Sequence, residues 1–327
     1  MKKQKRIEIV VTNTVGLNLM PKRTVKTVEE SLKENYQKVT VTKIESKDDL
    51  DELIRRKPDL VFSGVKYLGF DEKSKKRSSK NKIWLSSVLK KHGINHTGSE
   101  TQALKLEINK AKAKKALQRK EIRTANFFTL LPGQSLKKSL LSIDFPLFIK
   151  PIYEGGSKGI DESSVVRNFK ELKKKVLQLH GEINTEILIE KYLSGREFTV
   201  GIIRNFKTRK LEACPVELIP QINSRGYRIL SKQGKDDDLE SVISIKEIQL
   251  KKKIAQFAKN SFKALGARDY GRIDIRMDKN NRLHFLEANL VPGMGQGYFT
   301  RAMRIVKKES YSKVINNLAS IALNRAS

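Results

Sequence analysis

Two carboxylates and a carboxamide come together if residues 271–295, GRIDIRMDKNNRLHFLEANLVPGMG, fold as a hairpin. The polar tip Asp278–Asn281 separates two alternating runs, and reflecting one run on the other places Asp274 roughly opposite Glu287. Alternation puts Asn289 on the same face as Glu287. Such oxygen ligands suit Mg²⁺, which commonly joins carboxylates to phosphates. The trio is therefore a candidate metal site, and the alternative is a surface hairpin with ordinary ion pairs.

A second segment has the features of a phosphate site. Residues 145–160, FPLFIKPIYEGGSKGI, form a short apolar strand that ends in Lys150, followed by a loop with Gly155, Gly156 and Ser157. Because glycine permits positive φ and close approach, the backbone N–H groups of such a loop can lie against phosphate oxygens. Lys150 would supply a fixed cation. Taken alone, the loop equally fits a flexible hairpin connection.

A third segment, residues 187–203, contains two β-rich runs with the polar linker EKYLSGRE between them. In a nucleotide cleft, Glu190 and the backbone near Lys191 would pair with adenine edges, while Glu197 would accept hydrogen bonds from ribose hydroxyls. The alternative is that these residues are only linker charges.

Together these segments resemble the ATP-grasp superfamily, and within it the D-alanine–D-alanine ligase branch, in the same order over roughly residues 83–305. The resemblance includes HTGSETQALKLEINKAKAKKAL, residues 96–117, which is similar to that family's T-G-S segment before a helix with an ATP-contacting lysine, here Lys110. It continues through FIKPIYEGGSKG, EILIEKYLSGREFTVGII and YGRIDIRMDKNNRLHFLEANLVPGMG. No single piece is decisive, but four pieces in register are specific.

By position, the resemblance implies a complete ATP site. Lys110 and Lys150 are implied to contact the α- and β-phosphates under the loop Gly155, Gly156 and Ser157, while Glu190, Lys191 and Leu193 hold adenine and Glu197 holds the ribose. Two Mg²⁺ ions, or Mn²⁺ as an alternative, are implied to bind Asp274, Glu287 and Asn289. Arg272 and the backbone at Gly293 are implied to stabilise the transition state. The implied chemistry has two steps. A carboxylate attacks the γ-phosphate to form an acylphosphate, and an amine then displaces phosphate to give an amide, which needs in-line positioning, charge compensation and a dry cleft.

The departures from the family pattern lie in the substrate pockets. The loop Thr12–Thr24 lacks the glutamate that receives the first amino group, and Gly156 replaces a serine. Tyr298 stands near an expected serine, and the segment 223–238 replaces the family's lid. ATP and metal residues are kept while both amino-acid pockets differ. We therefore expect ligase chemistry on a substrate pair other than two D-alanines.

Length and patterning predict an α/β ATP-grasp fold with an N-terminal Rossmann-like, pre-ATP-grasp domain. Residues 6–98 alternate strand-like and helical runs, as in a parallel α/β domain. A single helix is expected from about Ser99 to Arg119, and Asp71–Lys82 is expected to be an exposed basic loop. The expected domains are residues 1–98, a central ATP-grasp subdomain 99–180 with the phosphate loop, and a C-terminal subdomain 181–327 with the metal hairpin.

Composition limits location and partners. No apolar run approaches 18 residues, so no membrane span is expected, and one cysteine, Cys214, fits a reducing cytoplasm. The formal net charge of +31 can mark a polyanion-binding surface, but the basic residues are spread along the chain without interleaved aromatics. Nucleic acid is therefore not the expected partner. Small amino-acid or peptide-like substrates are expected. The sequence does not give the oligomeric state, and a homodimer is one candidate assembly.

Three functions remain open from the sequence. The first is an ATP-dependent carboxylate–amine ligase that joins two amino acids, with D-alanine itself one candidate substrate. The second keeps this chemistry but uses a peptide, a polyamine or an intramolecular amine as acceptor. The third is a non-catalytic nucleotide- or polyanion-binding module, against which the intact metal trio argues.

Overall fold

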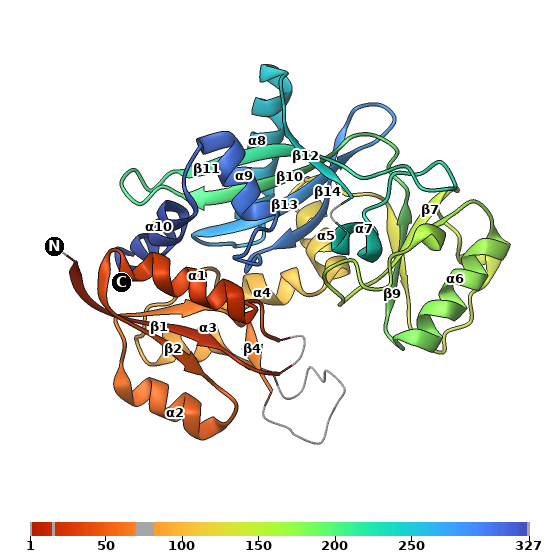
Figure 1. Cartoon of the computed structure of the whole chain (residues 1–327). Coiled ribbons are helices and arrows are strands. Elements are labelled where there is room, and N and C mark those ends of the chain that lie inside the picture. Colours follow the sequence, from red (N-terminus) through yellow and green to blue (C-terminus); the bar gives the residue numbers. More distant parts are fainter. Residues whose placement is uncertain (1, 15–16, 70–81, 238, 326–327) are drawn as a thin grey trace.

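Each of the three main regions of the chain is built around its own sheet (Figure 1). The computed structural model describes residues 2–14, 17–69, 82–237 and 239–325. The basic insertion expected at Asp71–Lys82 lies outside these residues except for Lys82. Among the described helices, none has the length and apolar character needed to cross a lipid bilayer.

The first region is a three-stranded parallel sheet in the order β2-β1-β3, as expected for residues 6–98. Its central strand buries Ile7 and Ile9 on one face and Val10 on the other, as expected for a parallel strand covered on both sides. The elements are β1 (Lys3–Val11), α1 (Lys22–Lys33), β2 (Tyr36–Lys43), α2 (Lys47–Arg56), β3 (Leu60–Ser63), β4 (Tyr67–Leu68), β5 (Ile83–Trp84) and α3 (Leu85–Lys91).

The expected single helix over residues 99–119 is two helices, so that prediction is wrong. α4 (Thr101–Glu107) ends before Asn109, and α5 (Lys110–Gln118) begins after it. The Asn109 side chain accepts a hydrogen bond from the backbone N–H of Lys112 at 2.8 Å, which is N-cap geometry. The break makes Lys110 the first residue of α5.

The second region is a four-stranded sheet in the order β6-β9-β7-β8 with α6 packed beside it. Because β9 pairs with β6 and β7, the change to the next sheet falls in the linker Tyr192–Arg196. The division at residue 180 remains a prediction. The elements are β6 (Phe127–Leu130), η2 (Lys138–Leu140), β7 (Leu147–Pro151), η3 (Glu162–Ser164), β8 (Val165–Val166), α6 (Phe169–Glu182) and β9 (Ile187–Lys191).

The third region is a five-stranded antiparallel sheet in the order β12-β11-β10-β13-β14. One face packs Phe198, Val200 and Ile202 under α8. The other face carries α9, which comes so close that a Cβ on Gly201 would lie 2.8 Å from Met303 Cε. The elements are β10 (Glu197–Arg204), β11 (Leu211–Ile219), α7 (Lys232–Asp236), β12 (Ser241–Ser244), α8 (Ile248–Ala264), β13 (Tyr270–Met277), β14 (Leu283–Asn289), α9 (Tyr298–Lys307) and α10 (Tyr311–Leu323).

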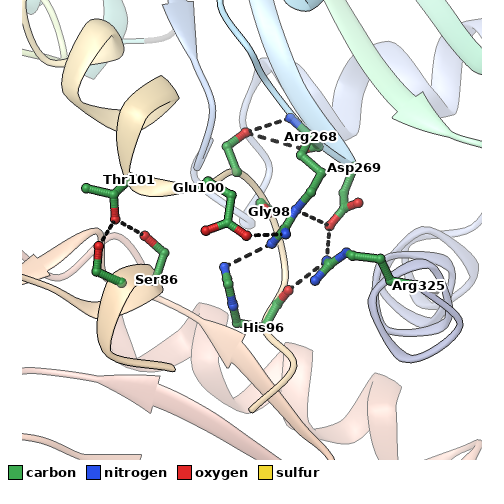
Figure 2. Close-up of polar contacts among 10 residues, drawn as sticks. Ser86, His96, Gly98, Glu100, Thr101, Arg268, Asp269 and Arg325 are labelled. Carbon is green, nitrogen blue, oxygen red and sulfur yellow. Dashed lines mark hydrogen bonds and ion pairs between the residues drawn. The ribbon is translucent and has the colours of Figure 1, made fainter. Parts of the chain in front are cut away.

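A buried polar cluster joins the first region to the third (Figure 2). Arg268 donates to His96 Nε2 and to the Gly98 carbonyl, both at 2.9 Å, and pairs with Glu100. Arg325, just after α10, donates to the His96 carbonyl at 2.9 Å. Since a guanidinium only donates, His96 Nε2 must accept and the neutral ring is required. Burial, with Arg268 and Arg325 adding repulsion, lowers the pKa of His96 to about 3.

This histidine predicts a specific loss of stability in mild acid. As the pH falls from 6.5 to 5, His96 becomes protonated in the unfolded chain but stays neutral in the folded protein. The free energy of unfolding should therefore fall by roughly 1–2 kcal/mol over this range. In His96→Gln, whose amide oxygen also accepts from Arg268, the drop in unfolding free energy over this window should shrink by that amount. Urea unfolding at both pH values measures it. His92→Gln, on an exposed histidine, is the control, and equal slopes for His96→Gln and wild type would contradict the account.

Candidate nucleotide and metal site

The predicted hairpin forms with the predicted register. Asp274 pairs with Glu287, and Arg272 with Asn289, across β13 and β14. The register then shifts, because Ile275 pairs with Phe285, and this leaves Leu286 as a bulge. Asp274 shares its face with Thr199 of the neighbouring strand, from which it accepts a hydrogen bond at 2.7 Å. The three oxygen-bearing side chains therefore lie together at one point of the sheet.

The hairpin side chains hold one another in place. Arg272 binds both oxygens of Asp274, each at 2.9 Å, and the Asn289 amide nitrogen lies 3.4 Å from Asp274 Oδ2. Because the amide nitrogen makes this contact, the amide oxygen of Asn289 is not used in it. Each carboxylate oxygen keeps lone pairs beyond those used here.

Glu287 is surrounded by cations. Burial opposes ionisation of its carboxyl, but Lys110, Lys150, Lys235 and Arg272 outweigh burial and lower its pKa to about 2. The nearest of them, Lys110 Nζ, lies 3.7 Å from Oε2. Glu287 is therefore ionised at neutral pH, as a metal-binding carboxylate must be.

The donor set fits a hard divalent cation only in part. No group of three or more His, Cys, Asp or Glu side chains able to hold a metal occurs in the described residues. Two carboxylates and one carboxamide supply part of an octahedral shell, and Mg²⁺ usually completes such a shell with water and substrate phosphates. The residues fit a metal that arrives with a nucleotide.

Lys150 belongs to a buried chain of ion pairs. Its Nζ is 2.6 Å from Glu190 Oε1, and Lys114 Nζ is 2.8 Å from Glu190 Oε2. Glu190 is 2% exposed and Lys114 0%. Because an unpaired charge would be costly there, each member of this chain depends on its neighbours. Lys110 is anchored separately, through a hydrogen bond of 2.5 Å to the Glu154 carbonyl at the start of the phosphate loop.

The glycine-rich loop is joined to the segment above it. Gly156 and Ser157 both have positive φ, of 62° and 61°. Ser157 Oγ donates to the Leu230 carbonyl at 2.8 Å, and the backbone N–H of Lys232 approaches the Ile160 carbonyl at 3.3 Å. The segment 223–237 thus lies against the loop, in the position expected of a lid, and Figure 1 shows α7 between the second and third sheets.

Part of the segment expected to contact adenine is already hydrogen-bonded within the protein. The backbone N–H of Lys191 donates to the Asn126 carbonyl at 2.9 Å, and its side chain donates to the Phe145 carbonyl at 2.8 Å. Leu193 remains at the pocket wall. Glu197 pairs with Arg276 at 3.0 Å, and burial raises its pKa, with Arg276 opposing.

One pocket collects most of the predicted residues. It has an empty volume of about 730 Å³, part of it open to solvent. Its lining includes nine of the predicted residues: Lys150, Ser157, Glu190, Lys191, Leu193, Glu197, Arg272, Asp274 and Glu287. Lys110 and Asn289 touch this set through Glu287 and Asp274. Gly155, Gly156 and Gly293 are not in the lining, and Gly293 lies beside the first loop, where its Cβ would be 4.0 Å from the Leu19 carbonyl.

Sequence reasoning missed four charged residues. Lys114 follows Lys110 by one turn of α5, a spacing that could have identified it. Lys235 of α7 lines the pocket, where burial lowers its pKa and Glu287 opposes. Glu240 accepts a hydrogen bond from Tyr298. Glu45, which follows β2, accepts a hydrogen bond from the backbone N–H of Asn13 at 2.5 Å. It therefore brings a carboxylate to the loop Thr12–Thr24, which has no acidic residue of its own.

A pocket between two sheets, with a glycine loop on one and carboxylates on the other, defines the ATP-grasp class of fold. The solved D-alanine–D-alanine ligase of Bacillus anthracis, complexed with ATP, has a TM-score of 0.71 and 22% identity, covering 98% of this chain and 97% of its own. The VanG D-Ala:D-Ser ligase of Enterococcus faecalis has a TM-score of 0.70 and 19% identity, covering 98% and 100%.

The family model described as "D-ala D-ala ligase C-terminus" matches residues 116–320, and the chain belongs to this D-alanine–D-alanine ligase family. The ligase of Aquifex aeolicus (strain VF5) is 30% identical over 202 residues, which are 62% of this chain and 64% of the relative. That of Hydrogenovibrio crunogenus is 26% identical over 240 residues, 73% of each. The match thus spans just under two thirds of the Aquifex relative's length.

The buried ion-pair chain predicts an effect of Lys114 on stability. Lys114→Met leaves Glu190 buried with Lys150 as its remaining cation, so the unfolding free energy should fall by roughly 2–3 kcal/mol. Chemical denaturation measures the loss. Lys115→Met, at the exposed neighbouring position, is the matched control. A loss in Lys114→Met no larger than in the control would show that the pair contributes nothing.

Proposed function

We propose that the chain is an ATP-dependent carboxylate–amine ligase that forms an amide bond through an acylphosphate. The observation that carries this proposal is the meeting of Asp274, Glu287 and Asn289 with Lys150 and Lys235 around one pocket. A module without chemistry would have no use for anionic ligands opposite a phosphate site, since they repel an uncomplexed nucleotide.

The chain's residues have separate tasks in this proposal. Lys110 and Lys150 bind the α- and β-phosphates under the loop 155–159, and Lys235, brought in by α7, faces the γ-phosphate. When bound, one or two Mg²⁺ ions held by the hairpin would neutralise charge on the transferred phosphoryl group. Arg272 and the backbone at Gly293 stabilise the oxyanions of the transition state.

The nucleoside end lies along the linker after β9. With the N–H of Lys191 bonded to Asn126, we assign the adenine edge to the backbone at Leu193, beside Glu190, and the ribose hydroxyls to Glu197. Phe148, Ile160 and Ile229 supply apolar walls for the base.

The metal assignment predicts that either carboxylate is essential. In Asp274→Asn and Glu287→Gln, ATP-dependent phosphate release should fall by at least about a hundredfold, because each removes a metal ligand charge. Circular dichroism should show the wild-type fold. Glu182→Gln, an exposed acid of α6, is the charge-matched control. Wild-type turnover in both hairpin variants would exclude the assignment.

The phosphate assignment predicts selective weakening of nucleotide binding. Lys150→Ala should weaken ATP binding about tenfold or more while adenosine binding changes little, because a lost charge-assisted contact costs about 1.5–3 kcal/mol. Titration calorimetry with both ligands tests this. Lys173→Ala, at an exposed position of α6, is the control. Equal weakening of ATP and adenosine would mean that the variant disturbs the fold.

The substrate pair is inferred from Tyr298, which lines the pocket and is held by Glu240 and by Arg272, whose guanidinium carbon lies 5.2 Å from the ring centroid. This ring takes up space near the metal carboxylates. We propose that the acceptor is an amine-containing amino acid, peptide or polyamine other than D-alanine. Glu45 supplies a carboxylate near the first loop, so the prediction for D-alanine rests on Tyr298.

A substrate panel tests this directly. D-alanine should be used with a kcat/KM well below about 10⁴ M⁻¹s⁻¹ at both positions, behind another amine–carboxylate pair. Tyr298→Ser should raise D-alanine use relative to that pair, whereas Tyr298→Phe, which keeps the ring and loses the hydroxyl, should not. Efficient D-alanine dimerisation by the wild type would refute the proposed difference in the pocket.

A further inference from the structure

A second pocket lies at the opposite end of strand β10 from the nucleotide site. β10 runs from Glu197, in the nucleotide pocket, to Arg204, in this second one. Seven steps of about 3.3 Å place the two roughly 20 Å apart. The second pocket has an empty volume of about 620 Å³ with its open mouth included, and it is lined by Arg204, Arg209, Lys210, Leu211, Gln256, Lys259 and Lys263.

The lining is unusual in its charge. Five of the seven residues are cations, and no acidic residue is among them. In the portion of the chain covered by the structure, none of the five forms an ion pair with a carboxylate. Lys259 and Lys263 are one helical turn apart on α8, so they face the β10–β11 turn together. Such a cluster of cations gives the pocket a positive electrostatic potential, which favours the binding of an anion.

The turn fixes the backbone of Arg209 and the guanidinium of Arg204. Arg209 has a φ of 60°, its N–H donates to the Asn205 carbonyl at 2.9 Å, and its own carbonyl accepts from Arg204 at 2.7 Å. Arg209 NH1 is buried and has no hydrogen-bond partner in the structure described. A buried donor without an acceptor carries a desolvation penalty, which an anion oxygen would remove.

We infer that this pocket binds a small anion with two or more phosphate groups, at a site separate from the nucleotide pocket. Several phosphates match five cations better than one, and the fork of Arg209 is suited to phosphate oxygens. The inference does not depend on the proposed ligase activity.

Lysine acylation followed by mass spectrometry tests the site residue by residue. With inorganic pyrophosphate and no divalent metal, Lys210, Lys259 and Lys263 should react at least about fivefold more slowly than without it. Lys252 and Lys253, exposed on α8 outside the pocket, are internal controls and should react unchanged. Equal protection of all five lysines, or protection of none, would overturn the inference. Protection of Lys150 reports binding of pyrophosphate in the nucleotide pocket and is measured separately. A negative result at one pocket can therefore be told apart from a negative result at the other.

A double variant provides the second measurement. Arg209→Asn with Lys259→Gln should abolish protection of Lys210 and Lys263, and Asn is suited to a positive φ, so the turn should be kept. Lys252→Gln with Lys253→Gln is the charge-matched control and should keep it. A short single-stranded oligonucleotide forms a further arm. If it protects the control lysines along with the pocket, the surface is a general polyanion face and the inference is wrong.

Discussion

The structure depends on a concentration of opposite charges that are removed from water between two sheets. Cations and carboxylates there stabilise one another, and removal of one member reduces the charge compensation of those that remain. The members are Lys110, Lys114, Lys150, Lys235 and Arg272 with Glu190, Asp274 and Glu287. In an ATP-grasp enzyme such a frame has a use beyond stability, because a nucleotide and its metals bring charges of both signs. In the proposed ligase, Lys150, which pairs with Glu190, would be shared with the incoming phosphates.

The surrounding elements explain why these charges stay in place. Asn109 caps α5 and so fixes Lys110 at its first turn, while Gly201 lets α9 pack closely on the face of the sheet that carries Asp274. The contact of Ser157 with Leu230 keeps the segment before α7 against the phosphate loop. Exclusion of water strengthens each electrostatic contact inside the pocket and would protect the acylphosphate of the proposed reaction.

Much of the site could be predicted because its information is local. The pairing of Asp274 with Glu287 was predicted from a short hairpin tip and is confirmed, but it depends on a bulge at Leu286 that period-2 alternation does not reveal: unbroken pairing from the tip would place Leu286 opposite Asp274. Glu45 and Glu240 could not be found in this way, since they reach their partners from elements distant in sequence. The break at Asn109 was missed because a helix-compatible pattern on both sides concealed a capping residue. Lys114 was missed because a lysine normally indicates a solvent-facing position, whereas here tertiary pairing overrides that preference.

The central claim is that the hairpin and the phosphate loop hold one metal–nucleotide complex between them. Crystals grown with Mn²⁺ and a non-hydrolysable ATP analogue would test it by anomalous scattering. The account predicts a manganese peak within coordination distance of Asp274, Glu287 and Asn289, with nucleotide phosphates beside Lys150. Nucleotide bound without metal at these side chains, or metal and nucleotide in different places, would contradict it.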